Sequence, residues 1–211
     1  VGWHNRVNLL VWGLPVVKDI TDPVPPNVAI HWPHGPATAS QPPAERPPNI
    51  ILILADDLGF NDVSLYNGGA ADGSVTTTNI DAIARQGVVF ENGYAANAVC
   101  APSRASLLTG RYSTRFGFEY TPFPNIGATI FQWMSDLEPP PLPLFIDHAA
   151  AKTLPPFEQL GMPAEQVTIA EVLKSRGYYT AHIGKWHLGS LPGMRPEDQG
   201  FDDSLYMAGT L

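Results

Sequence analysis

The chain has 211 residues and a mass of 22.8 kDa, enough for one domain with a sizeable core. Its formal net charge of −8 argues against nucleic-acid binding, which needs a basic face, but leaves anionic substrates open because a local cluster of cations can oppose the global charge. No apolar run approaches the roughly 18 residues of a membrane span, and the single cysteine excludes a disulfide within these residues.

Prolines are concentrated near the N-terminus, with nine of them in residues 23–48. This density favours polyproline II and is incompatible with a packed helix or a central strand. We therefore expect residues 1–48 to be a poorly ordered arm or leader, and residues 49–211 to form the folded part. The apolar segment Leu9–Val17 follows Arg6 as in the hydrophobic region of a signal peptide, but no clean signal peptide can be identified.

The first folded segment is a continuous apolar run at 50–54, which predicts a strand over 49–55 buried on both faces of a parallel sheet. The run ends at Asp56 and Asp57. In open α/β sheets, ligands bind beyond the carboxyl ends of the strands. Two adjacent carboxylates repel each other unless a cation neutralises them, so a divalent ion with oxygen ligands is a candidate partner. The alternative is a turn in which an aspartate caps a helix.

The only cysteine, Cys100, opens the segment Cys-Ala-Pro-Ser-Arg. Pro102 suits the first turn of a helix, which we predict over 103–109 with Gly110 as its stop. Cys100 then lies at or just before a helix N-terminus, where free N–H groups and the helix dipole favour an anion. Arg104, one turn further, adds a positively charged fork for an oxyanion. A buried apolar filler is the alternative for a lone cysteine.

The other predicted elements alternate between helix and strand. We expect a helix over 79–86 capped by Thr78, a short strand over 88–90, a long irregular stretch over 112–163, a helix from the Thr168/Glu171 capping box to about Arg176, and a strand over 178–183. This alternation predicts an α/β fold with a mostly parallel central sheet and helices on both faces.

A second chemical motif, Gly-Lys-Trp-His-Leu-Gly at 184–189, follows the last predicted strand. Lys185 and His187 are two positions apart, so an extended backbone would direct both to the same side. Such a pair can hold a tetrahedral anion and donate a proton to its leaving group. A Lys-x-His sequence by itself is weak evidence for a site.

In combination, the two motifs resemble the two signatures of the type I sulfatases, in the alkaline-phosphatase-like superfamily. The matching residues are Cys100, Pro102, Ser103, Arg104, the Leu-Thr-Gly-Arg of 108–111 and the Gly-Lys-x-His of 184–187, in the family's order. The resemblance covers about 48–211. It implies an alkaline-phosphatase-like sandwich that is incomplete in this chain, which carries only its N-terminal half. The family's later Asp-Asn pair and its further histidine and lysine cannot be placed.

The resemblance implies a sulfuric ester hydrolase of the arylsulfatase type. Cys100 would be converted after translation to formylglycine, whose hydrate attacks sulfur and expels the alcohol before sulfate is released. The implied calcium ligands are Asp56, Asp57 and the residue at position 100. Arg104 and Lys185 would stabilise the aldehyde hydrate and the sulfate charge, and His187 would hydrogen-bond the sulfate or the nucleophile.

The same resemblance implies a sulfated small molecule or saccharide as substrate, a formylglycine-generating enzyme as maturation partner, no nucleic acid, no membrane span, and a periplasmic or secreted location. We expect the 211-residue chain alone to be inactive, because half of the family's site is missing from it. Two alternatives remain at this point, a phosphonate or phosphodiester hydrolase of the same superfamily and an inactive calcium-binding fragment.

Overall fold

A computed structural model describes residues 41–122, 125–137, 145–151 and 153–207, together with 35, 36, 39, 141 and 142. The chain divides into two units, 1–37 and 38–211, and all described helices and strands lie in the second. The arm expected over 1–48 falls largely outside the described residues. Its last part, 41–48, is exposed to solvent.

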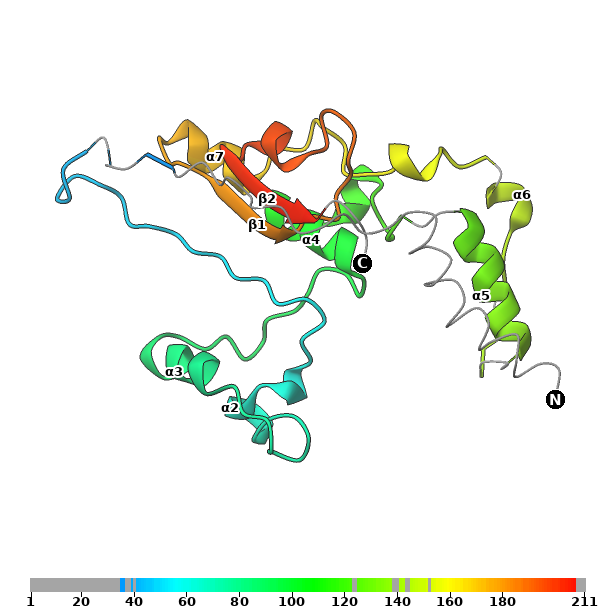
Figure 1. The fold of residues 1–211 in the computed structure, drawn as a ribbon, viewed down its shortest axis with the longest axis horizontal. Helices are drawn as coiled ribbons and strands as arrows, with labels where there is room; N and C mark the ends of the chain where they lie inside the picture. The colour runs from blue at the N-terminus through cyan, green and yellow to red at the C-terminus, as the bar shows by residue number, and fades with distance from the viewer. Residues whose placement is uncertain are drawn as a thin grey trace, which may run out of the picture. The chain divides into compact units, whose positions relative to one another are not determined.

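Two parallel strands, β1 (Ala181–Lys185) and β2 (Asp203–Met207), form the sheet of the described residues and run side by side in Figure 1. The connection between them contains the 3-10 turn η4 (Pro196–Gln199). β1 starts three residues later than predicted, because the Tyr178 N–H donates to the carbonyl of Leu173 (3.2 Å) and so closes the preceding helix. β2 was not predicted from the sequence.

Two helices pack beside this sheet, and their ends agree with the local sequence signals. α4 (Cys100–Thr109) ends at Gly110, whose φ of 64° is the left-handed conformation that glycine adopts readily. α7 (Ile169–Ser175) opens with both hydrogen bonds of a capping box, from Thr168 N to Glu171 Oε2 (2.7 Å) and from Glu171 N to Thr168 Oγ1 (3.3 Å).

The remaining elements are short, apart from two helices. α3 (Thr78–Gln86) lies where a helix was predicted. The prediction of an irregular stretch over 112–163 is wrong, because α5 (Asn125–Leu137) spans 13 residues of it. Apolar residues at 126, 130, 133 and 137 follow the helical period, and no proline interrupts them. The short elements are η1 (Phe60–Asp62), α2 (Ser64–Asn67), η2 (Ser113–Phe116), α6 (His148–Ala151) and η3 (Phe157–Gln159).

The strands predicted over 49–55 and 88–90 do not form in the part of the chain that the structure describes. Ile51 and Ile53 are 84% and 80% exposed, so burial on both faces is wrong. A parallel strand needs a hydrogen-bonded neighbour, and no described backbone hydrogen bond joins 50–54 to β1 or β2. The alternation of an extended chain nevertheless persists, since Ile50, Leu52 and Leu54 line a cavity of 480 Å³ against α4, α7 and β1.

A small apolar cluster joins α4 to the segment that follows β1. Its buried members are Ala101, Ala105, Phe118, Met162, Trp186 and Leu188. The two alanines of α4 are fully buried, and their small size lets the chain after β1 approach the helix closely. This cluster therefore fixes the N-terminal turns of α4 against the Lys-Trp-His segment.

Candidate active site

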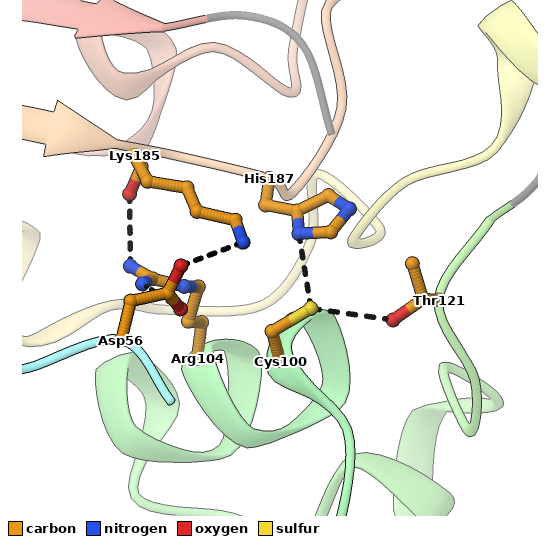
Figure 2. Close-up of polar contacts among 6 residues, drawn as sticks. All are labelled: Asp56, Cys100, Arg104, Thr121, Lys185 and His187. Carbon is orange, nitrogen blue, oxygen red and sulfur yellow. Dashed lines mark hydrogen bonds and ion pairs between the residues drawn. The ribbon is translucent and has the colours of Figure 1, made fainter. Parts of the chain in front are cut away.

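The apolar cluster sets the directions of the side chains in the second motif. Trp186 is 1% exposed and donates from Nε1 to the carbonyl of Met194 (2.8 Å), so its ring is fixed in the interior. Its neighbours Lys185 and His187 are directed instead toward the N-terminal end of α4, where Cys100 and Arg104 lie (Figure 2). Two segments more than 80 positions apart in sequence thus meet at one place.

Cys100 is the first residue of α4 and is partly buried. Its Sγ lies 3.3 Å from Nδ1 of His187 and 3.6 Å from Oγ1 of Thr121, two contacts that Figure 2 shows approaching the sulfur from different directions. Sulfur is a weak donor and acceptor, so these are weak hydrogen bonds that fix direction more than they stabilise the fold. The sequence motif thus places the sulfur at a helix N-terminus beside an imidazole.

His187 is held in an unusual conformation. Its φ is 63°, a left-handed value that non-glycine residues seldom adopt, and strained backbone of this kind is enriched at functional sites. β1 has already ended at Lys185, so the extended backbone expected between the two residues is wrong, although both side chains still reach the same region.

Burial lowers the pKa of His187, and the nearby charges of Lys185 and Arg104 lower it further. The ring is therefore mostly neutral near neutral pH, with one nitrogen as donor and the other as acceptor. Nδ1 faces the sulfur of Cys100, whereas Nε2 is buried without a hydrogen-bond partner among the described residues. A neutral imidazole so placed can accept a proton from, or donate one to, the group at position 100.

Two cations and one carboxylate form the other half of the site. Arg104 donates from Nη1 to the backbone carbonyl of Lys185 (2.9 Å) and from Nη2 to Oδ1 of Asp56 (2.8 Å). The ammonium of Lys185 contacts Oδ2 of the same carboxylate at 2.8 Å. The hydrogen bond from Lys185 and then that from Arg104 hold the pKa of Asp56 below its ordinary value. One positive charge remains in this group, in a chain whose net charge is −8.

The predicted metal ligands are not assembled. Asp57 is exposed, has a φ of 54°, and makes no described hydrogen bond or ion pair. Asp56 contacts the two cations, and Cys100 contacts His187 and Thr121. Among the described residues, no three histidine, cysteine, aspartate or glutamate side chains gather closely enough to hold a metal ion.

Sequence reasoning missed Thr121. This residue is 9% exposed and belongs to no motif, and it follows η2 in a stretch expected to be irregular. A single threonine before a proline gives no signal of a role at a site that lies 21 positions earlier in the chain. Only the folded path of the chain brings it to Cys100.

No helix in the described part of the chain combines the length and the hydropathy that crossing a bilayer would require.

Similar proteins are found for most of the chain. Human arylsulfatase A is 39% identical over 158 residues, which are 74% of this chain and 24% of that protein. Human N-acetylgalactosamine-6-sulfatase is 37% identical over 160 residues, 76% of this chain and 25% of that protein. The chain therefore spans about a quarter of the length of these curated relatives.

Solved structures agree with these sequence matches. The crystal structure of Ps i-CgsB superposes with a TM-score of 0.57 and 33% identity, over 78% of this chain and 29% of that one. The expected fold class is confirmed, with an alkaline-phosphatase-like fold present here in part as a parallel sheet with helices. The family model described as Sulfatase matches residues 48–210. The chain belongs to the sulfatase family.

Proposed function

We propose that the protein containing these residues hydrolyses sulfate esters and that position 100 carries its nucleophile as formylglycine made from Cys100. The observation that supports this most is the placement of Sγ at the start of α4, 3.3 Å from the imidazole of His187 and next to the group formed by Arg104, Lys185 and Asp56. When present, formylglycine supplies a hydrated aldehyde as nucleophile. A thiol in its place would be left as an S-sulfonate that must be hydrolysed at sulfur.

The chain's own residues have separate tasks in this proposal. Arg104 presents a planar fork and Lys185 a compact ammonium, and together they hold the oxygens of a tetrahedral anion. Both donors are held before substrate arrives, because Arg104 is bonded to the Lys185 backbone and the Lys185 ammonium to Asp56. Donors aimed in advance at developing charge are the main electrostatic contribution of such sites. His187 holds or moves a proton at Nδ1, next to position 100.

Calcium belongs to the same proposal, with Asp56 and Asp57 as two of its ligands and position 100 as a third. Carboxylate oxygens suit a hard divalent cation, which takes six to eight oxygens. The donor chemistry therefore fits, but the described residues offer too few oxygens to enclose the ion. Calcium would polarise sulfate and nucleophile oxygens. A sulfated small molecule or saccharide as substrate, a formylglycine-generating enzyme as partner, and a periplasmic or secreted location complete the proposal.

The test is to produce the complete protein together with a formylglycine-generating enzyme and to assay 4-nitrophenyl sulfate beside bis(4-nitrophenyl) phosphate, with Cys100→Ala as control. We expect conversion of Cys100, seen in the mass of its peptide, and preferred turnover of the sulfate that the control lacks. Preferred turnover of the phosphodiester would instead support the alternative hydrolase of the same superfamily. Failure to turn over either ester, despite full conversion, would contradict the proposal.

A further inference from the structure

The chain after α4 reverses direction and returns along the helix to its N-terminal end. Ser113 N donates to Oγ of Ser106 (3.0 Å), which ties η2 to the middle of α4. Phe118 N then donates to the carbonyl of Ser113 (3.1 Å), and the Phe118 ring enters the apolar cluster. These contacts fix the direction of residues 118–122.

The end of this return path places Thr121 beside Cys100. Thr121 and Pro122 are both buried, and the amide of Asn97, just before α4, donates to the carbonyl of Glu119 (3.4 Å). Threonine is branched at Cβ, so few side-chain conformations remain open to it once it is buried. Its hydroxyl therefore points at the sulfur because its surroundings hold it there, 3.6 Å away.

We propose that Thr121 is a positioning residue, whose hydroxyl holds the heteroatom on Cβ of residue 100 from a different direction than His187 does. This inference rests on the proposed function. Conversion of Cys100 to formylglycine is a two-electron oxidation at Cβ, for which the maturation enzyme must supply dioxygen as oxidant, and the sulfur leaves as hydrogen sulfide. Water then adds across the aldehyde without a further change in oxidation state, because the water oxygen bonds to Cβ and the carbonyl oxygen takes the proton. Two hydroxyls then stand where the sulfur was, one for each of the two neighbouring partners.

The contact should matter more after maturation than before it. A hydroxyl both donates and accepts strong hydrogen bonds to oxygen, but only weak ones to sulfur. Held by Thr121 and His187 together, the hydrate is favoured over the free aldehyde, and its reacting hydroxyl is kept in one orientation. Thr121 thus acts through the group at position 100.

The experiment uses the complete protein with cysteine labelled by carbon-13 at Cβ, the signal of residue 100 being assigned by its loss in Cys100→Ala. The variants are Thr121→Val, which keeps the shape and removes the hydroxyl, Thr121→Ser, which restores it, and Thr114→Val, the same change at an exposed threonine. In the matured protein, we expect Thr121→Val to lower the ratio of hydrate to aldehyde by about 3- to 10-fold, as for one lost hydrogen bond. Thr121→Ser and Thr114→Val should stay near wild type.

Activity gives a second measurement. Thr121→Val should lower kcat by about tenfold with little change in KM, and Thr121→Ser should recover most of the loss. A hydrate ratio unchanged in Thr121→Val would overturn the proposal. Equal defects in the valine and serine variants would also overturn it, since they would mean that Thr121 only fills space.

A third arm separates this inference from the proposed function. If wild-type protein shows neither aldehyde nor hydrate, Cys100 is not converted and the proposed formylglycine nucleophile is wrong. The contact of Thr121 with residue 100 is then tested on the unconverted thiol. In that form, Thr121→Val should shift the Cβ resonance of Cys100, whereas Thr121→Ser and Thr114→Val should not. If the Cβ resonance of Cys100 is the same in wild type and Thr121→Val, the contact between the Thr121 hydroxyl and the sulfur is contradicted.

Discussion

Arg104 donates a hydrogen bond to the backbone carbonyl of Lys185 at 2.9 Å, joining the helix that begins with Cys100 to the strand that ends in the second motif. The same guanidinium contacts Asp56 through its other nitrogen. One planar side chain therefore links three segments. A lysine in its place could keep the positive charge, but it could not donate hydrogen bonds to both partners in the fixed geometry of the guanidinium.

This linkage predicts the effect of Arg104→Lys in the matured complete protein. We expect kcat to fall by about 10²-fold, the usual loss when one preorganised donor is removed, with conversion of Cys100 retained. The matched control is Arg111→Lys, because Arg111 is exposed and bonds Gln166 away from the site. Steady-state kinetics measure the effect. Equal small losses in both variants would mean that the fork of Arg104 is dispensable.

Asp57→Ala should weaken calcium binding in the complete protein by at least about tenfold, because a hard cation loses one carboxylate. Asp72→Ala is a close control, since Asp72 is also exposed and has nearly the same left-handed φ, 55° against 54°. Both variants carry the same backbone strain, so a difference between them reports on the carboxylate. Calcium titration by calorimetry measures it, and identical affinities would exclude Asp57 as a ligand.

His182 on β1 should make stability depend on pH. Burial lowers its pKa, the Arg104 charge lowers it further, and its ring packs edge-on against Trp186, 5.2 Å between centroids. As pH falls, His182 therefore takes up its proton in the unfolded chain before it does so in the folded protein. The contribution of the neutral His182 ring to the free energy of unfolding is complete above about pH 6.5 and is lost as pH falls toward the lower pKa of the folded state.

The comparison is wild type against His182→Phe, which keeps a ring but cannot titrate. Urea unfolding from about pH 8 to about pH 5 should show wild type losing more stability than the variant, while other histidines such as His187 cancel in the difference. Parallel pH profiles for the two proteins would mean that His182 titrates alike when folded and unfolded.

The 211-residue chain alone should not hydrolyse sulfate esters, even with Cys100 converted. Its described residues supply two cations and one imidazole, and too few oxygens for calcium. Each missing donor reduces the rate by about 10²- to 10³-fold. Turnover of 4-nitrophenyl sulfate with added calcium, within about tenfold of the complete protein, would show that the site needs nothing further.

Local signals predicted local structure well. The Thr168/Glu171 capping box begins α7, Gly110 ends α4, and Cys100 lies at the helix N-terminus where its neighbours placed it. These features depend on residues within one helical turn. The meeting of Lys185 and His187 with α4 was also predicted, but only through resemblance to a family, since no local signal spans 80 positions.

Other features that depend on distant partners were not predicted correctly. An apolar run such as 50–54 predicts a buried strand, but whether it is buried and forms a strand depends on a neighbouring strand that offers hydrogen bonds. The bonds of Asp56 with Arg104 and Lys185 and the approach of Thr121 to Cys100 arise in the same way, from tertiary folding. A carboxylate pair predicts attraction to cations, and the sequence alone does not distinguish a metal from an arginine.

The long segment after α4 is anchored to the site at both ends. It leaves at Thr121, beside Cys100, and returns at Met162, whose N–H donates to the carbonyl of Leu188 (2.8 Å). Because both anchors are held by contacts of their own, a change in the number of residues between them alters only the loop-closure entropy, which grows slowly with loop length. Insertions or deletions between Thr121 and Met162 would therefore leave Cys100 and His187 in place.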